Sequence, residues 1–400
     1  MDIKQMIRRQ TIDDIEQQAQ KIAAMMGRIR ESLLAPTAVK TAPSLSAAQM
    51  AELCGVDKAK IIYRLSRGDL PAGSTVGNRR QWNLEESQPW MREFRNLHLR
   101  PAGAAGITIT VANFKGGVAK TTSAVTLAQG LSMRGHKVLV IDLDPQGSAT
   151  TLFGFLPDTD VGVEDTASNL FSGDEEDLQY AIRKTYWPNI DLVCAAPLLF
   201  GSEFELPARQ VKDPGLEFWR VLDYGLDSIR ETYDVIVIDT PPSLSYLTIN
   251  ALMAADGVIM PLPPSLLDFA SSAQFWDLFS DLCTQLLRGR GKSKSFEFID
   301  VLLSRVEASD TASSVVRQWV LEGYGDKVLP IEIPKTSIAA TASAEFGTVY
   351  DMAPGSANAR TVTRARDAYN RMCELIEQQI EAVWERQLNE RLEMEGKVKS

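Results

Sequence analysis

The sequence contains few of the residues that hold metal clusters or build disulfide frameworks. It has only two histidines, His98 and His136, and its four cysteines lie far apart without any C-x-x-C pair. Zinc sites, iron–sulfur clusters and disulfides are therefore not expected. The sequence also lacks an apolar stretch of the roughly 20 residues that span a bilayer, and its first residues, MDIKQMIRRQ, lack the apolar segment of a signal peptide. We expect a cytoplasmic protein with reduced cysteines and no membrane partner.

The composition is that of a folded protein with an uneven charge distribution. Of 400 residues, 44% are hydrophobic and 24% are charged, which allows a sizeable core and two or three domains. Lys and Arg outnumber Asp and Glu by 16 to 11 in residues 1–100 and are outnumbered 26 to 41 in the remainder. A basic N-terminal part on an acidic body indicates a polyanionic partner for the N-terminal part, although ordinary scatter in charge would give the same numbers.

Two segments rich in small residues and proline divide the chain into three parts. Residues 11–35 have apolar residues near helical spacing and predict one helix, which packs either on its own domain or on a partner helix. The segments 35–45 and 100–106 have the composition of linkers. The predicted domains are an N-terminal helix at 1–40, a basic unit at 41–100 and a larger body at 106–400.

The body alternates apolar strands with helices. Because parallel strands are buried on both faces, near-continuous apolar runs between helices indicate a parallel sheet covered on both sides. A helix is predicted at 121–134 and a long one at 361–395. The predicted fold class is therefore α/β, with strands at 107–113, 137–142, 191–195, 235–239, 257–261 and 298–304.

The strongest motif follows the first strand of the body and opens its first helix. It reads KGGVAKTT, from Lys115 to Thr122. Gly116 and Gly117 let backbone N–H groups point inward, and the helix that follows directs its positive end at phosphates. In a phosphate loop of this kind, Lys120 reaches the β- and γ-phosphates and the Thr121 hydroxyl binds Mg²⁺. The predicted nucleotide-binding residues are Lys115, Gly116, Gly117, Val118, Ala119, Lys120, Thr121 and Thr122.

Two acidic motifs end later strands. The sequence VIDLDPQG places Asp142 and Asp144 two residues apart, so both carboxylates lie on one face of a strand. The apolar run VIVID ends in Asp239 and is followed by Thr-Pro-Pro. Ligands of open α/β sheets bind at the carboxyl ends of the strands, so these carboxylates are expected beside the phosphate loop.

Together these motifs resemble the ParA/MinD family of P-loop ATPases, whose deviant Walker A sequence is K-G-G-x-[GS]-K-T and whose next motif is D-x-D-P-Q-G. Ala119 departs from the commonest form of that loop. The resemblance implies a Mg²⁺-dependent ATPase with ATP and Mg²⁺ as cofactors, which forms a nucleotide-sandwiched homodimer. It implies that Lys115 reaches the phosphates of the partner subunit and that Asp144 positions or activates the attacking water. The implied catalytic residues are Lys115, Lys120 and Asp144, and the implied metal-binding residues are Thr121, Asp142 and Asp239.

Residues 46–68 have the spacing of a helix-turn-helix. Ala51 is small where two helices cross, Gly55 suits the turn, and Ile61 is apolar on the second helix. The following residues contain turn glycines and the basic strand RRQW, as a wing does. The unit resembles a MerR-like winged helix-turn-helix, although a small helical domain for protein contacts has the same spacing. The cations predicted to contact DNA here are Lys58, Lys60, Arg64, Arg67, Arg79 and Arg80.

A second DNA-binding surface is predicted in the body. ParA-type ATPases bind DNA without sequence preference through basic residues, which here would be Arg360, Arg364 and Arg366, or the segment 288–294 (RGRGKSK). A solvated charged face is the alternative for each of these residues. The segments 257–268 and 330–337 resemble a strand and a later loop of the same family.

The resemblance predicts a larger ParA-type ATPase that segregates plasmid DNA in the cytoplasm and associates with the nucleoid. Its ATP-bound dimer would bind nucleoid DNA non-specifically, and a centromere-bound ParB-type partner would stimulate hydrolysis and release. The head would bind its own operator and repress its own operon. One alternative is a nucleotide-sensing transcriptional regulator without significant turnover. Another is a MinD-like regulator at the membrane, which the 7 acidic and 5 basic residues of 371–400 do not favour.

Overall fold

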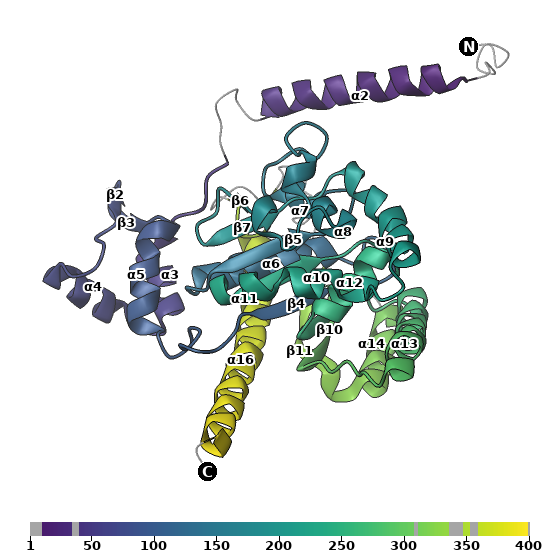
Figure 1. Ribbon diagram of the computed structural model, residues 1–400. Coiled ribbons are helices and arrows are strands. Elements are labelled where there is room, and N and C mark those ends of the chain that lie inside the picture. Colours follow the sequence, from purple (N-terminus) through teal and green to yellow (C-terminus); the bar gives the residue numbers. More distant parts are fainter. Residues whose placement is uncertain (1–9, 34–39, 308–310, 336–346, 353–358, 399–400) are drawn as a thin grey trace. The chain divides into compact units, whose positions relative to one another are not determined.

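The computed structural model describes residues 10–33, 40–307, 311–335, 347–352 and 359–398 (Figure 1). The chain divides into two units, Met1–Thr41 and Ala42–Ser400. The first unit contains helix α2 (Ile12–Leu33), and the second contains the basic head and the α/β body.

Helix α2 confirms the helix predicted at 11–35 as far as Leu33, and residues 34–35 lie outside the described part of the chain. Thr11 and Asp14 cap its first turn reciprocally: the Thr11 N–H donates to Asp14 Oδ2 at 2.9 Å, and the Asp14 N–H donates to Thr11 Oγ1 at 3.2 Å. Its described apolar side chains, Ile12, Ile15, Ile22 and Met25, are more than half exposed. Of the first predicted linker, at 35–45, residues 35–39 lie outside the described residues, and the described remainder, 40–45, has no helix or strand before Leu45.

The head has the predicted helix-turn-helix followed by a hairpin. Gly55 ends the first helix in the left-handed conformation (φ 64°), and Ala51 and Ile61 are buried where the two helices meet. Gly77 and Asn78 connect two antiparallel strands, the second of which is the predicted RRQW strand. A further helix, α5, was not predicted. The head elements are β1 (Leu45–Ser46), α3 (Ala47–Cys54), α4 (Lys58–Arg67), β2 (Ser74–Val76), β3 (Arg79–Trp82) and α5 (Leu84–Phe94).

The body is built on an eight-stranded sheet with the order β11-β10-β9-β4-β8-β5-β7-β6. All neighbouring strands are parallel except β6 and β7. The six predicted strands are present with ends shifted by one or two residues, and the α/β class is confirmed. The strands are β4 (Ile107–Val111), β5 (Val138–Asp142), β6 (Arg183–Lys184), β7 (Ile190–Val193), β8 (Val235–Asp239), β9 (Gly257–Leu262), β10 (Phe298–Val306) and β11 (Val328–Pro334).

The prediction of a loop at 330–337 is wrong for residues 330–334, because these residues belong to strand β11. Ile331 and Ile333 flank the charged Glu332, an alternation typical of a strand. Pro330 and Pro334 obscured that pattern in the sequence, but an edge strand tolerates proline because one row of its N–H groups pairs with no other strand. Residues 336–337 lie outside the described residues.

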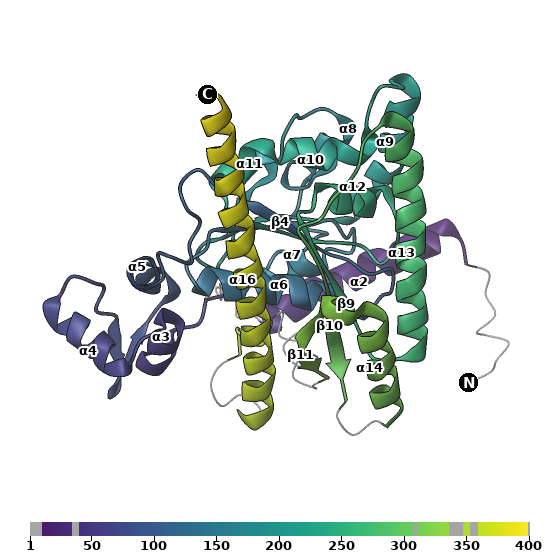
Figure 2. The same ribbon diagram turned by 90° about the horizontal axis from the view of Figure 1, so that it is seen from below.

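Helices cover both faces of the sheet. Val138 and Val140 of β5 pack into the same apolar cluster as α6 and α16, whereas Leu139 and Ile141 pack into the cluster that contains α8, α10 and α12. Figure 2 shows α16 running beside α6. No described helix is both long enough and apolar enough to span a membrane. The helices are α6 (Lys120–Met133), α7 (Ser148–Leu152), α8 (Ser168–Ser172), α9 (Ser202–Lys212), α10 (Val221–Gly225), α11 (Asp227–Thr232), α12 (Tyr246–Ala254), α13 (Leu266–Leu287), α14 (Thr311–Tyr324) and α16 (Ala359–Val398).

Helix α5 joins the head to the body through apolar packing and hydrogen bonds. Its Trp90 and Met91 are fully buried in the cluster that also contains α6 and α16. Gln88 Nε2 donates to the carbonyl of Ser132, in the last turn of α6, at 3.1 Å. Head and body therefore share one core, although the composition of 100–106 resembles a linker.

A buried cluster of charges reinforces this junction. The carboxylate of Glu377, on α16, accepts from His136 Nε2 at 2.7 Å and from Arg95 at 2.6 Å, and lies 3.5 Å from Arg134. Burial alone would raise the pKa of Glu377, but the hydrogen bond from His136 and the charges of His136, Arg95 and Arg134 lower it to about 2. A single carboxylate thus connects the end of α5, the end of α6 and the middle of α16.

The second predicted linker has no helix or strand, yet it is held on the body. The Arg100 guanidinium forms an ion pair with Asp234 at 3.0 Å and donates to the carbonyl of Arg230 at 2.8 Å. Trp384 of α16 donates to the carbonyl of Ala105 at 3.0 Å. A Cβ added to Gly106 would lie 2.2 Å from the carbonyl oxygen of Tyr233, so only glycine fits there.

Candidate active site

The sheet order brings the three sequence motifs together. Strands β4, β8 and β5 are neighbours, and each motif follows the carboxyl end of one of them. The phosphate loop follows β4, Asp239 ends β8, and Asp142 ends β5. The site predicted at this edge of the sheet is therefore assembled from three adjacent strands.

The phosphate loop has a defined backbone conformation. Asn113 fixes its start: its Oδ1 accepts from the Lys115 N–H at 3.1 Å, and its Nδ2 donates to the carbonyl of Pro261 at 2.9 Å. Gly117 and Ala119 both adopt left-handed conformations, with φ of 74° and 76°. This conformation costs a residue with a Cβ about 1–2 kcal/mol, so Ala119 carries strain that the glycine of the commonest family loop would avoid. Helix α6 begins directly after Ala119.

Lys120 lies inside the site rather than in solvent. Its side chain is buried, and its ammonium donates to the carbonyl of Lys115 at 2.9 Å. Burial lowers the pKa of Lys120, while the nearby Asp239 and Asp144 carboxylates counteract that shift. The ammonium thus stands among the phosphate loop and the two carboxylates, where it can meet the β- and γ-phosphates of a nucleotide.

Asp239 is the clearest candidate for a metal ligand. Its side chain is fully buried, and neither carboxylate oxygen accepts a hydrogen bond from any described residue. Burial raises the pKa of Asp239 well above its ordinary value, and Asp142 raises it further, whereas nearby Thr121 and Lys120 lower it. A buried carboxylate without partners costs considerable free energy, and a cation removes that cost. Asp239 with the Thr121 hydroxyl fits Mg²⁺, which takes few protein ligands and retains water and phosphate oxygens.

Asp142, which the resemblance assigns to the Mg²⁺ site, is held by hydrogen bonds from its own segment. Its Oδ2 accepts from the N–H and the hydroxyl of Thr150, both at 2.8 Å, and its Oδ1 accepts from the Asp144 N–H at 3.1 Å. Burial raises the pKa of Asp142 to about 7, although the hydrogen bonds from Thr150 lower it. The geometry favours a structural role, in which Asp142 anchors α7 and the turn that carries Asp144. Metal binding by Asp142 remains a prediction.

Asp144 lies at the open side of the site. It is half-buried, and its Oδ1 accepts from the Gln146 N–H at 3.0 Å. Burial raises the pKa of Asp144, while the Gln146 N–H and the Lys120 charge lower it. A carboxylate in this position can accept a hydrogen bond from a water molecule beside the γ-phosphate.

Lys115 is paired within its own subunit. Its ammonium lies 3.0 Å from Oδ1 of Asp268, in the first turn of α13. About one third of the Lys115 side chain is exposed, so the lysine can reach another subunit only if this ion pair opens. In the described part of the chain, no cluster of three or more His, Cys, Asp or Glu residues is arranged to hold a metal ion without a nucleotide.

Comparison with known proteins identifies the family. Residues 106–288 match a family model described as an AAA domain. The chain is 30% identical over 385 residues to a putative replication protein A of Rhizobium rhizogenes, a match that covers 93% of this chain and 95% of that protein. It is 32% identical over 319 residues to the protein SopA of Escherichia coli strain K12, covering 76% of this chain and 80% of SopA. The chain belongs to the ParA/SopA family of partition ATPases.

Solved structures agree with this assignment. The structure of a partition protein with 20% identity covers 92% of this chain and 98% of its own, with a TM-score of 0.65, which shows that the fold extends over the head and the body. A cobyrinic acid a,c-diamide synthase from Mycobacterium smegmatis was solved with an ATP analogue and magnesium. It is 29% identical, covers 67% of this chain and 93% of its own, and has a TM-score of 0.52. The partition protein described here is accordingly a P-loop ATPase of the larger ParA/SopA type.

The cations predicted to contact DNA in the head fall into two groups. Lys58, Lys60 and Arg67 on α4 and Arg79 on β3 are exposed. Arg64 instead forms ion pairs with Asp69 at 2.9 Å and Glu93 at 2.6 Å. Arg80 donates to the carbonyl of Ala72 at 2.6 Å. The geometry therefore favours the first group for DNA contact and gives Arg64 and Arg80 roles within the head.

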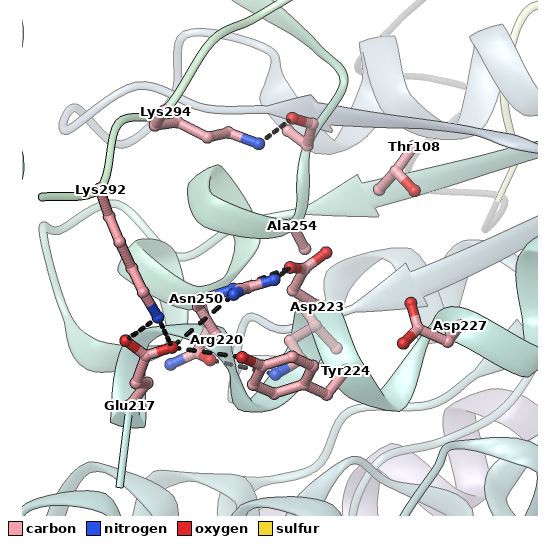
Figure 3. Close-up of polar contacts among 12 residues, drawn as sticks. Thr108, Glu217, Arg220, Asp223, Tyr224, Asp227, Asn250, Ala254, Lys292 and Lys294 are labelled. Atoms are coloured by element: carbon pink, nitrogen blue, oxygen red, sulfur yellow. Dashed lines mark hydrogen bonds and ion pairs between the residues drawn. The ribbon is translucent and has the colours of Figure 1, made fainter. Parts of the chain in front are cut away.

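The basic residues predicted in the body are divided in the same way. Arg360 and Arg364 are exposed at the start of α16, whereas Arg366 donates to the carbonyls of Val349 at 3.1 Å and Met352 at 3.3 Å. Figure 3 shows the Lys292 side chain directed toward Glu217. The Lys292 ammonium pairs with Glu217 at 2.6 Å, and Lys294 donates to the carbonyl of Ala255 at 2.6 Å. The segment 288–294 is thus largely committed to contacts with the body.

Several site residues carried no signal in the sequence. Asn113 and Asp268 lie beside known motifs, but their contacts depend on how strands β4 and β9 and helix α13 are placed. Ser304 and Arg305 lie about 185 residues after the loop they contact. Only the order of strands in the sheet shows that these residues belong to the site.

Proposed function

We propose that this partition ATPase moves plasmid DNA by cycling between two DNA-binding states. With ATP and Mg²⁺ bound, two copies form a dimer across the phosphate loops, and this dimer binds nucleoid DNA without sequence preference. A centromere-bound, ParB-type partner stimulates hydrolysis and returns the protein to a state in which the head binds its own operator. Because a nucleotide shifts states only by binding them unequally, the two DNA activities are coupled through the site.

The observation that carries this proposal is the position of Lys115. The lysine begins the phosphate loop, is partly exposed, and forms an ion pair with Asp268 rather than with Asp144 or Asp239. Lys120 already supplies the cation that the site itself requires. A second lysine at the rim is explained if it meets the nucleotide of another copy.

The head supports the second DNA-binding activity. Its exposed cations on α4 and β3 lie on the second helix and the hairpin of a winged helix-turn-helix. These are the elements that enter a DNA groove in such folds. The presence of SopA and replication protein A among the relatives agrees with a role in plasmid maintenance.

Retention of non-specific DNA tests the first activity. We expect the wild-type protein to bind DNA of random sequence at least about tenfold more tightly with ATP than with ADP, because only ATP supports the dimer. Lys115→Ala should remove this difference, whereas Asp268→Asn, which releases Lys115, should preserve or increase it. The measurements are fluorescence anisotropy of labelled DNA and sedimentation of the protein with each nucleotide.

The outcome of that experiment separates the two readings of the family resemblance. If ATP and ADP give equal DNA affinity and neither supports a dimer, the proposed cycle is wrong. A protein that then binds only its own upstream region would be a nucleotide-sensing transcriptional regulator.

Binding of the head to its own upstream DNA tests the second activity. Lys60→Ala and Arg67→Ala should each weaken that binding by about tenfold, with the basal ATPase rate unchanged. Each should also lower the slope of log K against log salt concentration by about one, as expected for the loss of one phosphate contact. Arg371→Ala, which alters an exposed cation of α16, is the matched control. If both head variants bind like the wild type, the head does not contact DNA through α4.

A further inference from the structure

Two residues at the end of β10 hold consecutive carbonyl groups of the phosphate loop. The Ser304 hydroxyl donates to the carbonyl of Val118 at 2.9 Å, and the Arg305 guanidinium donates to the carbonyl of Gly117. Ser304 is fully buried, whereas Arg305 is exposed and reaches the loop from its outer side. Neither residue belongs to the motifs that define the site.

The backbone of β10 is irregular at this point. Leu303 pairs with Glu332 and Val306 pairs with Pro334, so β10 has one more residue than β11 between these pairs. The extra residue lies in the Ser304–Arg305 segment, and Arg305 has a φ of 52°. A bulge redirects side chains at the end of a strand, and a left-handed residue with a Cβ costs free energy. The bulge is thus the local feature that turns the arginine toward the loop.

Peptide geometry shows what these two hydrogen bonds do. In a planar trans peptide, the carbonyl of one residue and the N–H of the next point in opposite directions. Holding the Gly117 carbonyl toward β10 therefore turns the Val118 N–H away from β10. Holding the Val118 carbonyl toward β10 does the same for the Ala119 N–H.

The sheet order shows where those N–H groups point. Strand β10 lies on one side of β4, and strands β8 and β5 lie on the other. Asp239 and Asp144 stand on that second side, together with the ammonium of Lys120. The amides of Val118 and Ala119 are accordingly directed toward the part of the site where phosphate oxygens bind.

We propose that Ser304 and Arg305 are positioning residues that preorganise the phosphate loop for the β-phosphate of the nucleotide. They do not touch the nucleotide but fix the direction of two amides that do. Without them, Gly117 and its neighbours can rotate, and the loop must be ordered each time a nucleotide binds. Ala119 and Arg305 both have strained φ values. The hydrogen bonds between the phosphate loop and the end of β10 stabilise these two conformations together.

Nucleotide titrations on the full chain test this role. Arg305→Ala should weaken the binding of fluorescent ADP and fluorescent ATP to the same extent, by about tenfold, because the amides cradle the phosphates in both. The KM for ATP should rise by the same factor, and kcat should change by less than about twofold, as expected for uniform binding. Arg305→Lys should restore most of the affinity, and Ser304→Ala should resemble Arg305→Ala.

Two comparisons keep the proposal open to refutation. Arg305→Gly removes the guanidinium and the left-handed strain together, so recovery of affinity in this variant would show that backbone strain, not the contact, is responsible. If Arg305→Ala lowers kcat but leaves ADP binding intact, the arginine contacts the γ-phosphate and the proposed positioning role is wrong. If Arg305→Ala lowers only the melting temperature, its role is structural. Arg371→Ala should match the wild type in every measurement.

Discussion

Asp144→Ala is expected to lower the rate of ATP hydrolysis by at least about a hundredfold while the Kd for ATP changes by less than about threefold. Asp144 is half-buried beside Lys120 and is turned by Asp142 and Gln146 toward the open side of the site. If Asp144 positions the attacking water, as the resemblance implies, its removal slows hydrolysis but removes no contact that holds ATP. The measurement is phosphate release at saturating ATP, together with a titration of fluorescent ATP.

The same variant should remain on DNA. Because it binds ATP without turning it over, we expect Asp144→Ala to retain non-specific DNA for as long as ATP is present. Asp326→Ala, which removes an almost fully exposed carboxylate, is the control and should hydrolyse ATP like the wild type. A hundredfold loss of ATP affinity in Asp144→Ala, or a normal rate of hydrolysis, would contradict the assigned role.

Glu377→Ala is expected to destabilise the second unit by about 3–5 kcal/mol. The substitution leaves Arg95, Arg134 and His136 facing one another in the interior without their anion, and uncompensated buried charges are costly. Glu377→Gln, which keeps the shape and can accept one hydrogen bond, should lose less. Asp326→Ala is the control, since this almost fully exposed carboxylate faces Lys327 at 4.0 Å on the surface. Urea unfolding monitored by tryptophan fluorescence measures all three.

The pH dependence of the free energy of unfolding is a second test of the same cluster of charges. The pKa of Glu377 is about 2 in the folded protein and has an ordinary value of 4.5. Since the unfolded chain takes up its proton first, the contribution of Glu377 is fully present above pH 4.5 and is lost as the pH falls toward 2. The difference between the two pKa values corresponds to about 3 kcal/mol. Glu377→Gln should lose less stability than the wild type between pH 4.5 and pH 2. A wild-type protein that is equally stable at these two pH values would contradict the lowered pKa of Glu377.

Local sequence patterns predicted much of the fold. The strand β4 is a β-branched run, β5 and β8 are apolar runs that end in aspartate, and the helix-turn-helix has glycine at the turn, where the backbone is left-handed. Some of the elements that the sequence analysis did not place have patterns that are short or interrupted. β6 has two residues, β11 contains two prolines, and α5 contains Pro89 together with polar residues that become buried only against α6.

The sequence identified candidate site residues only where they belong to a motif with fixed spacing along the chain. Lys115, Lys120 and Asp144 follow from motifs, and the structure brings the last two together. The sequence could not show that Asp142 accepts a hydrogen bond from Thr150. Nor could it show the ion pairs of Lys115 with Asp268 and of Arg64 with Asp69. Those contacts depend on which segments become neighbours in space, which residue spacing does not encode.

The continuous core between head and body limits how the DNA specificity proposed for the head could change. Helix α5 packs on the wing through Trp90 and Trp82, which both donate to the carbonyl of Pro71, and on the last turn of α6 through Gln88. If the chain is divided anywhere between residues 82 and 106, at least one of the two fragments lacks part of the shared apolar core. A fragment beginning at residue 106 would expose apolar surface and leave Glu377 without Arg95. Exchange of whole heads between relatives is therefore unfavourable, and, if the head binds an operator as proposed, a new operator would be reached by substitutions on the surface of α4 and its hairpin.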